Sequence, residues 1–189
     1  MKKIIILVFL NILLFAKDSG VYLELEGGGL VNNEIEKDNN NYGVTNSYEA
    51  NINIGYQFQK KFRVEYEFRY IKEDIIYFNN YKATGDAIYN SNMINGYYSA
   101  YNDTKMVTSF GLGAGISNVS LKNMTQLQQP QADININGVF SYQGILGVGY
   151  MYNENITFSF KYKYFSTLKK NQLDALNKNI FSIGVRYLF

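Results

Sequence analysis

The side chains that decide the fold lie between Phe62 and Tyr70, where the chain reads FRVEYEFRY. Apolar or aromatic residues occupy every even-numbered position, and charged residues occupy every odd-numbered one. Successive side chains of a β-strand point to opposite faces of a sheet, whereas a helix would distribute these residues around its axis. The segment therefore predicts a strand with one apolar face and one charged face.

Seven more segments of the chain alternate with the same period of two. They predict strands over residues 21–26, 48–58, 94–100, 109–116, 140–150, 156–164 and 181–189. Most of the eight predicted strands are near ten residues long, which is the length that a tilted strand needs to cross a bilayer.

The connections between the predicted strands alternate between long and short. The short ones cover residues 59–61, 102–104 and 152–155, and the long polar ones cover 31–46, 72–92, 118–137 and 166–178. Outer-membrane barrels combine an even number of strands with short periplasmic turns and longer external loops. A soluble sandwich has no reason to sort its connections in this way.

The environment of the apolar face separates a soluble sandwich from a membrane barrel. In a sandwich this face packs on a second sheet, whereas in a membrane barrel it contacts lipid and the polar face lines the interior. Aromatic residues gather toward the strand ends, as interfacial belts require, and the opposite face carries glycines and single charges. Because backbone groups in lipid must pair internally, a spanning sheet has to close. We therefore predict an all-β fold for residues 17–189, an eight-stranded antiparallel up-and-down transmembrane β-barrel with short periplasmic turns and long extracellular loops.

The composition excludes most enzyme chemistry. The chain of 189 residues contains neither cysteine nor histidine, which removes thiol nucleophiles, disulfides, Cys/His metal sites and histidine bases. Glu65 and Glu67 share a face, as a general acid/base pair would, but Arg63 and Arg69 flank them there and indicate ion pairing instead. We expect no enzymatic activity, no cofactor and no metal.

The first sixteen residues have the layout of a secretory signal. Lys2 and Lys3 form a positive head, an apolar run extends from Ile4 to Phe15, and Ala16 precedes the expected cleavage point. An uncleaved anchor is the alternative, although the run is short for a membrane span. Without residues 1–16, the 18 basic residues become 16 and balance the 16 acidic ones. A chain of zero net charge has no electrostatic basis for binding nucleic acid.

Charged residues on the inward-facing parity of the strands form the first candidate site. Five acids face five bases in this set: Glu24, Glu26, Glu49, Glu65 and Glu67, with Arg63, Arg69, Lys161, Lys163 and Arg186. Side chains fill the interior of an eight-stranded barrel, and unpaired charges there would be costly. We expect the charges to pair and close the lumen; a gate or narrow ion path is the alternative.

The long external connections are the second candidate site. Residues 72–92 contain Tyr77, Phe78, Tyr81 and Tyr89, and aromatic side chains of this kind can anchor a host or matrix ligand. The same residues are equally compatible with strand extensions above the membrane or with loops that pack on themselves. Two functions remain open: a monomeric surface protein with a structural or adhesive role, and a small porin-like channel for ions or small solutes.

Several segments resemble the OmpA-like eight-stranded outer-membrane barrel family. They are Asn95-Gly96-Tyr97-Tyr98, residues 111–115 (GLGAG), residues 140–150, residues 161–165 (KYKYF) and the C-terminal pattern Ile183, Val185, Tyr187, Phe189. The resemblance covers the barrel domain only. It implies a place among the lipids of a Gram-negative outer membrane, and assembly by periplasmic chaperones and the barrel-insertion machinery. Val185, Tyr187 and Phe189 resemble the C-terminal signal that this machinery recognises.

Overall fold

The computed structural model describes residues 19–31, 34–37, 40–78, 81–101, 104–126, 129–130, 133–170 and 174–189. The predicted signal segment, residues 1–16, lies outside the described residues. No helix within the described ranges is both long enough and apolar enough to span a membrane.

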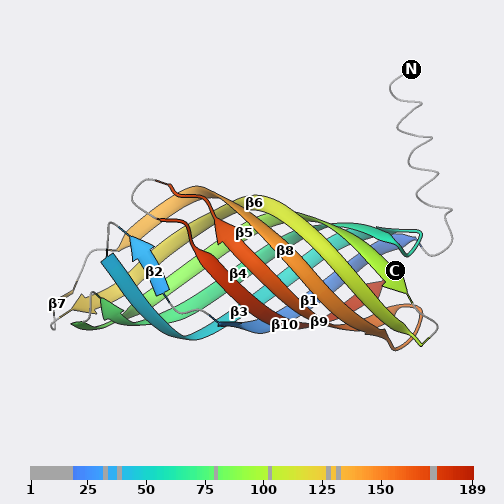
Figure 1. The fold of residues 1–189 in the computed structure, drawn as a ribbon, viewed down its shortest axis with the longest axis horizontal. Helices are drawn as coiled ribbons and strands as arrows, with labels where there is room; N and C mark the ends of the chain where they lie inside the picture. Colours follow the sequence, from blue (N-terminus) through green and yellow to red (C-terminus); the bar gives the residue numbers. More distant parts are fainter. Residues whose placement is uncertain are drawn as a thin grey trace, which may run out of the picture.

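Eight long antiparallel strands form a closed barrel (Figure 1). They are β1 (Gly20–Val31), β3 (Asn40–Phe58), β4 (Phe62–Phe78), β5 (Tyr81–Tyr101), β6 (Met106–Gln126), β8 (Ile134–Met151), β9 (Ile156–Thr167) and β10 (Asn177–Leu188). Two short strands, β2 (Glu34–Lys37) and β7 (Gln129–Pro130), pair with β3 and β6 respectively. Long strands that follow one another in the chain are neighbours, and β1 pairs with both β3 and β10. This last pairing closes the sheet and confirms the predicted fold.

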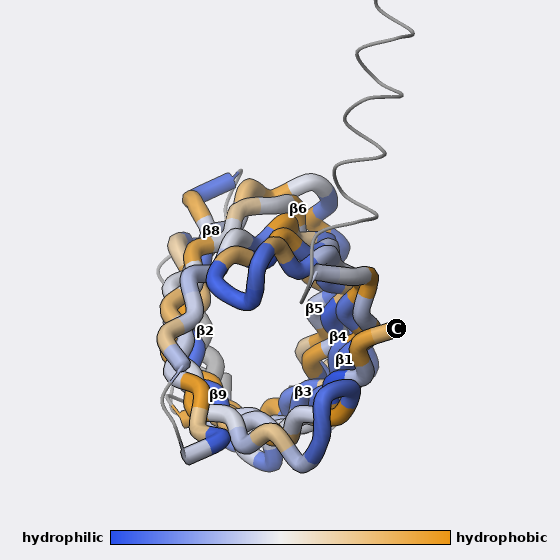
Figure 2. The backbone as a smooth tube through the Cα atoms, turned by 90° about the vertical axis from the view of Figure 1, so that its right-hand side faces the viewer, coloured by the Kyte–Doolittle hydropathy of each residue, from blue (hydrophilic) through white to orange (hydrophobic). Residues whose placement is uncertain are grey.

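The alternation of exposed and buried side chains follows the predicted parity. On β4, Phe62 and Val64 are about half exposed on the outer surface, whereas Arg63 and Glu65 are buried inside. The closing seam obeys the same rule, because Leu25 lies beside Val185 on the outside and Glu24 beside Arg186 on the inside. Seen along the barrel axis, the strands form a ring in which hydrophilic and hydrophobic residues intermix (Figure 2).

The two ends of the barrel differ. At one end, here called the turn end, the strands are joined by short connections; residues 59–61 form a hydrogen-bonded turn, with Gln59 and Lys60 both at positive φ, as in a type I′ hairpin. The C-terminus lies at this end, on the right of Figure 1. At the other end, here called the hairpin end, the strands continue as long hairpins. Residues 102–103 lie outside the described part of the chain.

Three of the four predicted long connections are mostly strand in the described residues, so they are paired hairpins rather than irregular loops. For residues 72–92 this is the strand extension that was left open as an alternative. Within residues 72–92, β4 and β5 continue as a paired hairpin, with Lys72 opposite Ile88 and Asp74 opposite Asp86. Residues 31–46 contain β2 and the start of β3, and residues 118–137 contain the end of β6 and the start of β8. Between 166 and 178, by contrast, the described residues are mostly irregular. The alternation continues into the hairpins, but with reversed polarity and interrupted by bulges.

The reversal of polarity divides the barrel into two parts. In the turn half the outer surface is apolar and the interior is charged. In the hairpin half, apolar side chains fill the interior, among them Ile71, Met93, Leu121 and Phe165, while polar residues such as Lys72 and Lys122 lie outside. The hairpin half thus has the apolar interior and polar outer surface of a soluble barrel. The same strands form a membrane barrel in the turn half.

Candidate functional site

The ten charged residues predicted to face the lumen all lie inside the barrel. Each of the ten residues is buried, with 6% or less of its surface exposed. They come from five strands: β1 and β10 at the closing seam, their neighbours β3 and β9, and β4. Residues far apart in the sequence therefore meet in one buried network in the turn half.

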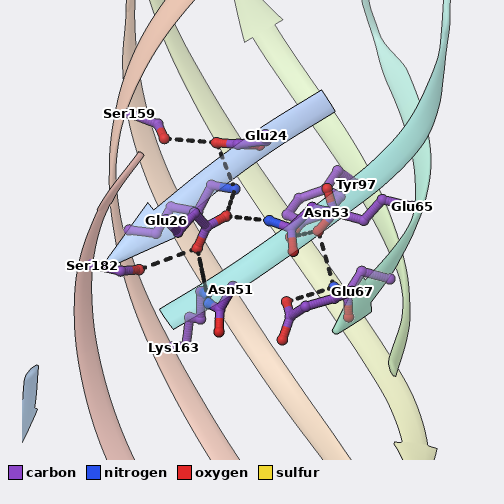
Figure 3. Close-up of polar contacts among 12 residues, drawn as sticks. Glu24, Glu26, Asn51, Asn53, Glu65, Glu67, Tyr97, Ser159, Lys163 and Ser182 are labelled. Carbon is purple, nitrogen blue, oxygen red and sulfur yellow. Dashed lines mark hydrogen bonds and ion pairs between the residues drawn. The ribbon is translucent and has the colours of Figure 1, made fainter. Parts of the chain in front are cut away.

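Glu26 is the centre of one cluster in this network. Its carboxylate accepts hydrogen bonds from Lys161 Nζ at 2.6 Å and from Asn53 Nδ2 at 2.6 Å, and it also pairs with Lys163 (Figure 3). Lys161 Nζ in turn lies 3.0 Å from Glu24. Two lysines of β9 thus neutralise two glutamates of β1, which ties these strands together across β10.

Arg69 is the centre of a second cluster. Its guanidinium pairs with Glu67, and its Nε lies 3.4 Å from Glu49. Arg69 also donates to Gln143 Oε1, and the amide of Gln143 donates to Asn95 at 2.7 Å. Removing one partner of such a buried pair leaves an uncompensated charge and costs about 3–5 kcal/mol.

Glu65 is held by neutral donors. Tyr22 Oη donates to its carboxylate at 2.8 Å, Tyr97 Oη at 2.7 Å and Asn95 Nδ2 at 3.0 Å. The guanidinium of Arg63 lies over the Tyr97 ring, 4.7 Å from its centroid. Glu65 and Glu67 are therefore members of one packed hydrogen-bonded network, which Asn95 joins by donating to both carboxylates.

The lumen of the turn half is tightly filled. The cavity lined by Glu24, Arg63, Lys161 and Arg186 has a volume of about 10 Å³, near the lower limit for a single water molecule. Inward-facing glycines make this packing possible. A Cβ at Gly113 would lie 1.9 Å from Asn95 Oδ1.

The hairpin half contributes a further buried ion pair that was not predicted. Lys178 Nζ lies 2.9 Å from Glu73 Oε2 inside the barrel, and Ser47 Oγ donates to Glu73 at 3.1 Å. Both charged residues lie in stretches that had been assigned to loops. Glu73 continues the inward parity of Arg69 and Ile71, which is the signal that would have identified it.

The aromatic residues that were predicted as loop contacts differ in their exposure to solvent. Tyr77 and Tyr81 lie near the tip of the β4–β5 hairpin and are 51% and 57% exposed. Tyr89 is 1% exposed, so its prediction as an external contact is wrong. It lies on the inward parity of β5, opposite Val119, and packs in the apolar cluster. The side chain of Phe78 lies outside the described part of the structure.

Val185, Tyr187 and Phe189, the predicted assembly signal, form an exposed apolar row at the turn end. All three side chains are between 45% and 72% exposed. The rings of Tyr187 and Phe189 contact each other edge to face, with centroids 5.0 Å apart. No group of three or more acidic residues within the described ranges is arranged to hold a metal ion.

Comparisons with known proteins agree with this architecture. Residues 7–189 match the family model for the outer membrane protein beta-barrel domain. No curated protein matches the chain.

Solved structures with the same fold include three bacterial barrels. Neisserial surface protein A has 16% identity and a TM-score of 0.67, with 90% of this chain and 99% of that chain covered. OprG of Pseudomonas aeruginosa has 14% identity and a TM-score of 0.62, with 90% and 96% covered. Ail of Yersinia pestis, solved with the heparin analogue sucrose octasulfate, has 16% identity and a TM-score of 0.53, with 90% and 97% covered. The chain belongs to the outer membrane protein beta-barrel domain family, and it is a barrel of the outer membrane, in contact with lipid.

Proposed function

We propose that this surface barrel has a non-enzymatic structural and adhesive role, exerted at its hairpin end. The observation that carries the proposal is the filled interior. Charged pairs occupy the lumen of the turn half, and an apolar cluster occupies the hairpin half. In outer-membrane barrels the short turns face the periplasm, so the hairpin end faces the cell exterior.

Ion pairs and hydrogen bonds that cross-link the hairpin end support this role. The outer surface of the β4–β5–β6 sheet carries a polar ladder, in which Lys72 Nζ lies 2.8 Å from Asp86 and Asn123 donates to Asp86 at 3.1 Å. Lys170 Nζ donates to the carbonyls of Asn137 and Gly138 at 2.8 and 2.7 Å, beyond the last β9 residue. A preformed surface loses little conformational entropy when it binds a partner.

The exposed residues near the β4–β5 tip suggest the chemistry of a ligand. Tyr77 lies opposite Lys82, and Tyr81 is its exposed neighbour. Aromatic rings beside an ammonium group suit a sulfated polysaccharide, in which sugar faces alternate with anionic groups. The Ail structure contains a heparin analogue, which makes heparin a reasonable first probe.

Binding of the reconstituted protein to immobilised heparin and to extracellular matrix tests the adhesive role. We expect Tyr81→Ser together with Lys82→Ser to weaken binding about tenfold or more. Tyr152→Ser is the matched control, because Tyr152 is 62% exposed in a turn at the opposite end. Equal binding by all three proteins would contradict the proposed contact surface.

A small channel is the second candidate function, and the packed lumen weighs against it. Planar-bilayer recordings on the purified protein are expected to show no steady unitary conductance. A large, steady conductance would contradict a closed lumen and would indicate a pore.

The C-terminal row is proposed to act in assembly rather than at the surface. We expect Phe189→Ala to slow insertion of the unfolded chain by the barrel-insertion machinery while leaving the stability of the assembled barrel little changed. Insertion is followed by the different gel mobility of boiled and unboiled protein. Unchanged insertion kinetics would remove this role.

A further inference from the structure

The outer wall of the turn half contains a groove that the surface role does not use. It has a volume of about 740 Å³ and crosses five neighbouring strands, β4, β5, β6, β8 and β9. Every residue that lines it lies in one of these strands. Most of its large side chains are aromatic: Phe62, Tyr98, Phe110, Tyr162 and Tyr164.

Two glycines on the outward parity form hollows in the groove. Gly96 of β5 and Gly144 of β8 both lie opposite Leu112, one on each side of it. Because neither neighbour has a side chain, Leu112 stands free between the two hollows and is 77% exposed.

The packing of the barrel interior does not require these two glycines. A Cβ at the inward-facing Gly111 would lie 2.6 Å from the ring of Tyr97, whereas a Cβ at Gly96 or Gly144 would meet no atom within 4 Å. Neither glycine has a positive φ. A glycine inside a strand weakens it, and often marks a place where a ligand or another chain approaches closely. The space at Gly96 and Gly144 therefore serves something outside the barrel.

Contacts with neighbouring side chains hold the aromatic walls of the groove in place. The rings of Phe62 and Tyr98 lie with their centroids 5.4 Å apart. At the other end of the groove, Tyr164 Oη donates to Asn177 Oδ1 at 3.0 Å. A groove with fixed walls loses little conformational entropy when it is filled.

The groove is continuous with the surface that contacts lipid. Leu112 and Phe110 belong to the outward apolar row of β6. On β4 the groove reaches Phe62, the first residue after the turn at 59–61, so it extends to the periplasmic side of the membrane. The hydrocarbon core contains no water, so apolar groups of the bilayer or of another protein fill the hollows.

The shape of the groove favours lipid chains over a second copy of the barrel. Five of the eight long strands contribute to the groove, so it follows the curvature of the wall. A second barrel is also convex and rigid, and two such walls touch along a narrow strip. Association of protein surfaces within lipid also lacks a hydrophobic driving force. Flexible acyl chains, by contrast, can follow a curved groove and pass on both sides of Leu112.

We propose that the groove is a binding site for one diacyl phospholipid of the periplasmic leaflet. One acyl chain lies over Gly96 and the other over Gly144, with the Leu112 side chain between them. The two hollows are two strands apart, a separation of about 10 Å. Dispersion contacts with the aromatic walls hold the chains, and the headgroup lies toward the turn end.

Native mass spectrometry tests the site by counting the lipids that the full chain retains in detergent, during a titration with palmitoyl-oleoyl phosphatidylethanolamine. The wild type should retain one lipid more than the double variant Gly96→Leu/Gly144→Leu, in which added side chains fill both hollows. The affinity for this lipid should fall about tenfold or more, because the lost contacts are many and individually small. Ala50→Leu is the matched control and should bind as the wild type does, since Ala50 is an outward residue of β3 that does not line the groove.

Fluorescence quenching locates the lipid. The chain contains no tryptophan, so Phe110→Trp places a single reporter in the groove and Phe68→Trp places one on the wall outside it. At a low mole fraction of phosphatidylethanolamine with brominated chains in detergent, the reporter at 110 should be quenched strongly and the one at 68 weakly. Gly96→Leu/Gly144→Leu should remove the difference.

Equal lipid counts for the wild type and the double variant would overturn the proposal, as would equal quenching at 110 and 68. A dimer of the wild type that the double variant abolishes would assign the groove to a second copy, and would also overturn it. Gel mobility before and after boiling shows whether each variant is assembled. Should the double variant fail to assemble, the two tryptophan reporters without the glycine substitutions carry the test.

Discussion

The turn half and the hairpin half of the barrel are built on the same strands, yet their polarity is opposite. On β6, the outward row changes from Leu112 and Ile116 to Ser120 and Lys122 as the strand leaves the membrane. The inward row changes in the opposite sense, from Gly113 and Ser117 to Val119 and Leu121. The medium outside the wall thus determines which face of a strand forms the packed core.

The change occurs within one or two residues on β4 as well. Outside, Tyr70 is followed by Lys72; inside, Arg69 is followed by Ile71. A charged interior is tolerated where lipid surrounds the wall, because polar side chains cannot face lipid and must pair with each other inside. Where water surrounds the wall, burial of apolar side chains inside is favourable.

The largest expected effect comes from breaking the charged core of the turn half. Arg69→Met leaves Glu49 and Glu67 without their guanidinium partner, so we expect the free energy of unfolding to fall by about 3–5 kcal/mol. Urea unfolding in lipid vesicles, followed by circular dichroism, measures it. Lys72→Met, three residues later on the outer surface, is the control and should cost less than about 1 kcal/mol. Similar costs for both variants would mean that the buried network does not stabilise the barrel.

The apolar core of the hairpin half is tested by the same substitution at two leucines of β6. Leu121→Ala leaves a cavity inside the barrel and should cost about 2–5 kcal/mol. Leu112→Ala loses only the transfer free energy, since lipid chains fill the space at a side chain that is 77% exposed. Its cost should be lower by about 1 kcal/mol or more. A larger cost at Leu112 would contradict the packed core above the membrane.

The outer surface of the two halves should differ in its tolerance of charge. Leu112→Lys places an ammonium group in the hydrocarbon and should lower the free energy of unfolding by about 2–4 kcal/mol. Ser120→Lys, eight residues further along the same face, should stay within about 0.5 kcal/mol of the wild type. The same urea titration measures both. Equal tolerance at the two positions would place the membrane boundary elsewhere.

The smallest expected effect is the pH dependence of the outer ladder. Hydrogen bonds from Lys72 and then Asn123 lower the pKa of the Asp86 carboxyl, and the bond to Asp86 raises the pKa of Lys72. A carboxyl with a lowered folded-state pKa stabilises the fold above its unfolded pKa, and this stabilisation is lost as pH falls through the folded value. Between about pH 5 and pH 2, Asp86→Asn should therefore lose less stability than the wild type, by under about 1 kcal/mol. An identical pH profile would show that the ladder is fully screened by water.

The sequence predicts the turn half well, because a regular period of two and three short connections identify both faces of each strand. Arg63, Glu65, Glu67 and Arg69 were assigned to the lumen by parity alone. The hairpin half escaped prediction for two physical reasons. Bulges interrupt the pairing, as between Ser117 and Val119, and the outward positions carry polar residues such as Lys72 and Lys122, which resemble a loop in sequence.

Contacts between distant segments were beyond sequence reasoning. Lys178 and Glu73 are separated by 105 residues and meet only because β10 and β4 belong to one closed barrel. Charge counting on the inward parity balanced five acids against five bases, but which acid meets which base, such as Glu26 with Lys161 and Lys163, appears only in three dimensions.

The reversal of polarity along one strand is tested most directly by spin labels on β6. The chain contains no cysteine, so a single nitroxide-labelled cysteine can replace Leu112, Ile116, Ser120 or Lys122 in turn. In nanodiscs, labels at 112 and 116 should collide mainly with molecular oxygen dissolved in lipid, and labels at 120 and 122 mainly with a water-soluble nickel chelate. Uniform accessibility along all four positions, or entry of the nickel chelate at 112, would contradict a wall that passes from lipid into water between Ile116 and Ser120.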